Sequence, residues 1–154
     1  MPSERSRAAL AVGLVAWTLL APGCWGSGAA SLELVGPEAL ARLPRAVASQ
    51  LPDDVVLCLD ETGHDGDYRL WILRRPEGSR LQLSPKLKGL ESHEMPASAL
   101  RSLLVFRMPT LDLGGPSDSH CRLSHWRLPD GAEIQIREIV TEKGWFASVE
   151  RVAL

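Results

Sequence analysis

The final third of the chain, HCRLSHWRLPDGAEIQIREIVTEKGWFASVERVAL at residues 120–154, gives the clearest indication of the fold. Ile134 and Ile136 alternate there with polar residues, as in a strand with one apolar face. The tripeptides PDG at 129–131 and EKG at 142–144 are typical of tight turns. We therefore predict an antiparallel meander of three strands at 120–128, 132–140 and 145–154.

The preceding residues of the chain show similar patterns. Apolar or alternating runs predict strands at 31–35, 54–60, 67–75 and 80–84. A helix is expected from Pro37 to residue 51, with a kink or restart at Pro44, because proline suits the first turn of a helix but not its interior. A second helix is expected at 96–105.

Together these elements predict an α+β fold in a single globular domain at 31–154. We expect a mostly antiparallel sheet of six or seven strands with one or two short helices packed on it. The predicted core consists of Trp71, Leu73, Ile134, Ile136, Trp145 and Val149.

Two segments of the chain resemble each other. RRPEGSRLQL at 74–83 and WRLPDGAEIQI at 126–136 share the order Pro, acid, Gly, two residues, aliphatic, Gln, aliphatic. One interpretation is a pseudo-duplicated unit of strand, helix and three strands. The other is convergence, because Pro-acid-Gly turns and alternating strands are common.

The N-terminus has the composition of a signal peptide. Arg5 and Arg7 precede an apolar run at 8–21, which at about fourteen residues is shorter than the roughly 20 that a membrane span needs. The small residues SGA at 27–29 or GAA at 28–30 suit cleavage, giving a signal peptide at 1–30. The alternative is a buried N-terminal helix.

The stretch LAPGC at 20–24 resembles the lipobox of bacterial lipoproteins, with Pro22 departing from the usual pattern. The resemblance covers only the targeting segment. It implies a signal peptide at 1–23, a lipidated Cys24 as the first mature residue and a flexible leader at 24–30. The expected location is then extracytoplasmic, in the periplasm or at the outer surface, with a lipid anchor in the membrane.

The chain has three cysteines, so one is left over if two of them pair. With Cys24 carrying lipid, Cys58 and Cys121 form the even pair that an oxidising compartment would join. The disulfide would close a loop of about 63 residues and stabilise the fold by about 4 kcal/mol in the chain-entropy model. The alternative is two separate buried thiols.

The segment ETGHDGD after Asp60 is the densest polar cluster in the sequence. Its weak candidates for metal ligands are His64, Asp65 and Asp67, and the alternative is a solvated turn. A second cluster, HCRLSH at 120–125, does not suit a metal, because alternation in a strand separates its side chains. We find no catalytic motif and no cofactor-binding motif in the sequence.

A formal net charge of −2 gives no reason to expect a nucleic-acid partner. A local basic stretch could instead meet an anionic polymer, lipid head groups or another envelope protein. Its members are Arg69, Arg74, Arg75, Arg80, Lys86 and Lys88. The alternative is a solvated hairpin.

The sequence thus favours an exported, non-catalytic envelope protein that acts as a small binding or assembly module. The alternative function is that of a metal-assisted hydrolase or lyase using the loop at 60–67. Metal binding separates these two hypotheses.

Overall fold

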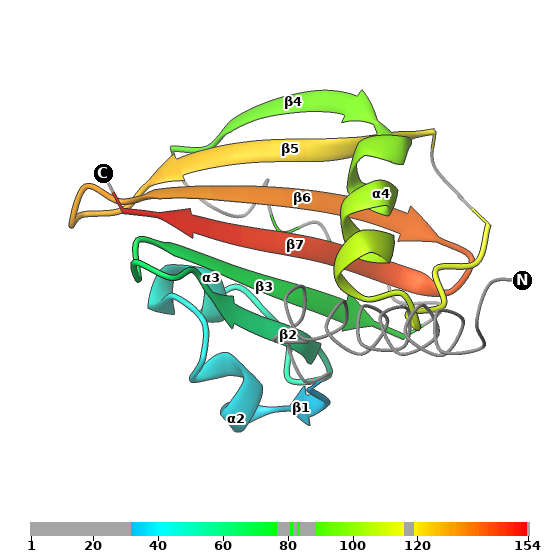
Figure 1. The fold of residues 1–154 in the computed structure, drawn as a ribbon, viewed down its shortest axis with the longest axis horizontal. Helices are drawn as coiled ribbons and strands as arrows, with labels where there is room; N and C mark the ends of the chain where they lie inside the picture. The colour runs from blue at the N-terminus through cyan, green and yellow to red at the C-terminus, as the bar shows by residue number, and fades with distance from the viewer. Residues whose placement is uncertain (1–31, 77–80, 82, 84–88, 116–118, 154) are drawn as a thin grey trace, which may run out of the picture. The chain divides into compact units, whose positions relative to one another are not determined.

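The computed structural model of the chain describes residues 32–76, 81, 83, 89–115 and 119–153. These residues contain seven strands and three short helices (Figure 1). The strands are β1 (Leu34–Val35), β2 (Val56–Thr62), β3 (Tyr68–Arg75), β4 (Glu91–Pro96), β5 (His120–Arg127), β6 (Glu133–Thr141) and β7 (Gly144–Val152). The helices are α2 (Pro37–Leu40), α3 (Arg45–Ala48) and α4 (Ala97–Arg107).

All seven strands form one antiparallel sheet in the order β1-β2-β3-β7-β6-β5-β4. The first three strands run from one edge towards the middle of the sheet. The chain then passes to the opposite edge at β4 and returns through β5 and β6 to β7. The last strand therefore pairs with β3, from Tyr68 opposite Val152 to Arg75 opposite Trp145.

Both faces of the sheet are covered. One face carries Trp71, Trp145 and the other predicted core residues, and α2, α3, Leu81 and Leu83 pack on it. The opposite face carries Leu70, Ile72 and Phe146 beneath α4, which crosses in front of β5, β6 and β7 in Figure 1. Burial on both faces explains why the central strands contain continuous apolar runs rather than strict alternation.

The predicted antiparallel sheet, its strand number and its core residues are confirmed. Three helices are present rather than the one or two expected, because α2 ends at Leu40 and a separate helix, α3, begins directly after Pro44, in line with the predicted restart there. The predicted strand at 80–84 is wrong at Leu81 and Leu83, which are buried without strand pairing. Its other residues lie outside the described part of the chain.

The predicted Cys58–Cys121 disulfide is absent, and both residues are buried free cysteines. Cys58 lies on β2 and Cys121 on β5, with β3, β7 and β6 between them. Four strand spacings correspond to about 19 Å, whereas a disulfide needs Cα atoms within about 7 Å. The sheet order therefore excludes this pair in the folded chain.

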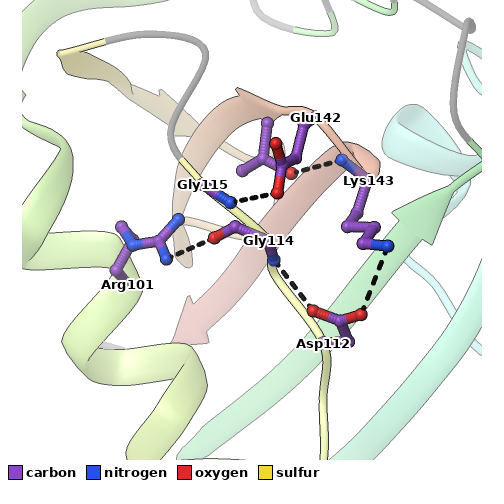
Figure 2. Close-up of polar contacts among 7 residues, drawn as sticks. Arg101, Asp112, Gly114, Gly115, Glu142 and Lys143 are labelled. Carbon is purple, nitrogen blue, oxygen red and sulfur yellow. Dashed lines mark hydrogen bonds and ion pairs between the residues drawn. The ribbon is translucent and has the colours of Figure 1, made fainter.

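A polar network fixes the segment after α4 to the β6–β7 turn (Figure 2). Arg101 Nη2 donates to the Gly114 carbonyl at 2.7 Å, and the Gly115 amide donates to Glu142 Oε1 at 2.7 Å. Lys143 Nζ lies 3.6 Å from Asp112 Oδ2. Every side chain in this network contacts a backbone group or another side chain of the network. We therefore assign the network a structural role.

Candidate functional site

Two arginines lie side by side at one end of the sheet. Arg69 of β3 and Arg151 of β7 are register partners, on the face that carries Trp71. Like charges placed directly opposite each other in a sheet repel, so a carboxylate beside each one stabilises the pair. Arg69 Nε and Nη2 donate to the two carboxylate oxygens of Asp60, both at 2.8 Å. Arg151 Nη2 donates to Asp130 Oδ2 at 2.8 Å.

The link between α2 and α3 and the first residue of α3 add two more arginines. Arg42 Nη1 lies 3.6 Å from Asp60 Oδ2. Arg45, the first residue of α3, makes no ion pair within the described part of the chain. Four guanidinium groups thus face two carboxylates, those of Asp60 and Asp130, and the cluster keeps an excess of two positive charges.

Trp71 lies at the base of this cluster. Its side chain is 2% exposed, and the guanidinium carbon of Arg69 lies 4.9 Å from the ring centroid, within cation–π distance. The indole Nε1 is buried and has no hydrogen-bond partner among the described residues. A buried donor without a partner costs about 1–3 kcal/mol, so this position favours any acceptor that reaches it.

These residues line a cavity of about 830 Å³, which we call the arginine pocket. Its basic members are Arg42, Arg45, Arg69 and Arg151. Its apolar wall includes Leu43, Pro44, Leu128 and Pro129. Ligand pockets in proteins commonly have volumes of about 300–1,000 Å³ and combine apolar walls with a few polar groups, and the arginine pocket has both properties.

A second, smaller cavity of about 300 Å³ lies beside Glu138 and Trp145. Glu138 is 6% exposed, and its Oε1 accepts hydrogen bonds from the Leu83 amide at 2.5 Å and from Trp145 Nε1 at 3.3 Å. The indole N–H of Trp145 is therefore satisfied from within the fold, whereas that of Trp71 is not. This difference makes the arginine pocket the stronger candidate for a ligand site.

The predicted metal-binding candidates His64, Asp65 and Asp67 are exposed on the turn between β2 and β3. No group of three His, Cys, Asp or Glu side chains in the described ranges is placed to hold a metal ion. Asp60, the first carboxylate of that loop, is 5% exposed and is bound by Arg69. The geometry therefore gives the alternative function no support from this loop.

The three described members of the predicted basic stretch do not share one surface. Arg69 and Arg75 share one face of β3, whereas Arg74 projects from the other. Arg74 pairs with Glu33 at 3.1 Å and Arg75 with Asp54 at 2.8 Å. Arg80, Lys86 and Lys88 lie outside the described residues.

The histidines of β5 are arranged as strand alternation predicts. His125 shares the α4 face with His93 of β4, and their ring centroids are 6.4 Å apart. His120 lies on the opposite face, where its Nδ1 is 2.9 Å from Ser119 Oγ. Ser119 and His120 are both exposed, and they line the mouth of the smaller cavity beside Glu138 and Trp145.

Sequence reasoning identified only Arg69 among the four arginines of the pocket. Arg42, Arg45 and Arg151 come from a helix link and from the end of the last strand, far from Arg69 in sequence. No local pattern joins them. The sequence offered only an indirect signal for the pocket. Arg69 and Trp71 are two residues apart in a predicted strand, so they lie on the same face of it.

No protein-family model, no curated protein and no solved structure matches this chain. Along the described residues, none of the helices combines the length and the apolar character that a membrane crossing requires.

Proposed function

We propose that the chain is exported and that residues 31–154 act outside the cytoplasm as a non-catalytic binding or assembly module, held at a membrane by lipid on Cys24. Arg5, Arg7 and the apolar run at 8–21 support export. The lipobox-like LAPGC at 20–24 and the small residues that follow it support the anchor.

The arginine pocket carries the binding part of this proposal. Guanidinium groups stay protonated at physiological pH and offer five N–H donors each, so they hold anions by charge and by paired hydrogen bonds. They are poorly suited to exchanging protons with a substrate. A pocket lined by four arginines and by Trp71, whose buried indole N–H has no partner among the described residues, therefore favours binding over acid–base catalysis.

Export and anchoring are tested together by expressing the full-length chain in a bacterial host with labelled palmitate. We expect the protein in the membrane fraction, with an intact mass that begins at Cys24 and includes diacylglycerol. The Cys24→Ser variant should lose the label, whereas Cys58→Ser, a matched cysteine variant, should keep it.

Two outcomes would contradict the proposal. A mature chain that begins after Ala29 or Ala30, without lipid, removes the anchor. A cytoplasmic protein that retains residues 1–23 removes export altogether.

A further inference from the structure

We infer that the arginine pocket binds an amphipathic organic anion, whose oxyanion head lies between Arg45, Arg151 and the Trp71 indole N–H. The apolar body of the ligand would lie along Pro44, Leu128 and Pro129. This inference deepens the proposed function, on which it rests, by naming the class of ligand for the same site.

Several guanidinium donors of the arginine pocket have no acceptor among the described residues. Arg151 donates through Nη2 to Asp130, and no described residue accepts from its Nη1. Arg69 uses Nε and Nη2 for Asp60, which leaves Nη1 without an acceptor among the described residues. Arg45 has no carboxylate partner in the described part of the chain. A carboxylate or phosphate head fits these forked groups, because each can accept two parallel N–H bonds.

The buried indole N–H of Trp71 is a further donor without a partner among the described residues. Trp71 lines the pocket, and its Nε1 is the only unpartnered indole nitrogen among the buried side-chain atoms described. An oxyanion held by the neighbouring guanidinium groups would supply the acceptor that this N–H lacks. The positive charge of the arginines and the unsatisfied indole N–H would therefore both be matched by the oxyanion head of the ligand.

The size and the apolar wall of the cavity favour a ligand with an apolar body. A small hydrated ion leaves most of its volume of about 830 Å³ unfilled and gains nothing from the apolar wall. Burial of apolar ligand surface against Leu43, Pro44 and Leu128 adds affinity that an inorganic ion cannot obtain. The pocket thus favours an organic anion over free phosphate or sulfate.

The test uses the mature protein as processed by the cell, labelled with ¹⁵N, with octanoate, monooctyl phosphate and inorganic phosphate as probes. We expect octanoate or monooctyl phosphate to move the indole N–H resonance of Trp71 and to bind at least about tenfold more tightly than inorganic phosphate. The resonance is assigned by its loss in Trp71→Phe. The two organic probes separate a carboxylate ligand from a phosphate ligand.

Arg45→Gln and Arg151→Gln should each weaken binding of the organic probe by about tenfold or more. The matched control is Arg127→Gln, which like Arg151→Gln removes a surface ion pair, here with Glu133 at 3.0 Å, but lies outside the pocket. It should leave affinity unchanged. Both site variants alter exposed or half-buried side chains, so they test the inference even where Trp71→Phe fails to fold.

Equal affinity for inorganic phosphate and the organic probes would overturn the inference, as would binding that survives both arginine substitutions. Binding of an acidic polysaccharide or of anionic vesicles, without binding of any small probe, would also overturn it. Failure here is distinct from failure of the proposed export, which the mass and fractionation measurements report independently.

Discussion

Gly144 begins β7 with a φ of 123°, a conformation that other residues rarely adopt. A Cβ atom there would overlap the backbone carbonyl oxygen of Arg75 on the neighbouring strand. We expect Gly144→Ala to lower the free energy of unfolding by about 3 kcal/mol or more, because backbone strain and steric overlap act together. Urea denaturation measures this change.

Gly131→Ala provides the control for that substitution. Gly131 also has a positive φ, of 87°, but a Cβ atom at this position meets nothing within 4 Å. Strain alone should cost about 1–2 kcal/mol. Equal losses in the two variants would show that the close approach of Arg75 contributes nothing.

Because of Cys58, the free energy of unfolding should decrease as the solution becomes alkaline. Burial raises the pKa of its thiol from 9.0 to about 11, and the positive charge of Arg74 offsets part of this rise. As pH increases, the thiol of the unfolded chain ionises first, which favours unfolding. The contribution of Cys58 is therefore complete below pH 9.0 and is lost as pH rises towards about 11.

Urea denaturation of the wild type and of Cys58→Ala across this pH range measures the effect. We expect the difference in stability between the two proteins to shrink as pH rises. A constant difference would contradict the raised pKa, since all other titrating groups are common to both.

At the level of elements, α4 is held by one of its faces. Leu100 and Leu104 are fully buried in the cluster beneath the helix, whereas Val105 and Phe106 are 52% and 73% exposed. We expect Leu104→Ala to cost about 2–5 kcal/mol, because it leaves a cavity between α4 and the sheet. Phe106→Ala should change stability by less than about 0.5 kcal/mol. Thermal or urea unfolding of both variants tests this contrast.

Strands with a strong apolar pattern were predictable as elements, but β4 was not. Its sequence, Glu91–Pro96, is mostly polar and exposed, as is typical of an edge strand that must not pair with another chain. Such a strand is held mainly by its backbone pairing with β5 rather than by burial. The internal duplication suggested by the two Pro-acid-Gly segments stays a prediction.

At the level of the whole molecule, sheet order determines the state of the cysteines. With three strands between β2 and β5, Cys58 and Cys121 should both remain thiols even in an oxidising compartment. We expect thiol titration of the denatured mature protein, without reductant, to detect two reactive groups beyond position 24. If no reactive thiol were detected beyond position 24, the chain would have to form the disulfide and fold with a different strand order.

Local patterns in the sequence were enough to predict the antiparallel sheet, the core residues Trp71 and Trp145, and the tight turns at 129–131 and 142–144. These features follow from local alternation and turn chemistry, which act over a few neighbouring residues. The separation of the two cysteines and the meeting of Arg42, Arg45 and Arg151 beside Arg69 emerge instead from the way the whole chain folds. The order of the strands and the position of the α2–α3 link control both outcomes. That order depends on how both apolar faces of the whole sheet are buried, which no short stretch of sequence specifies.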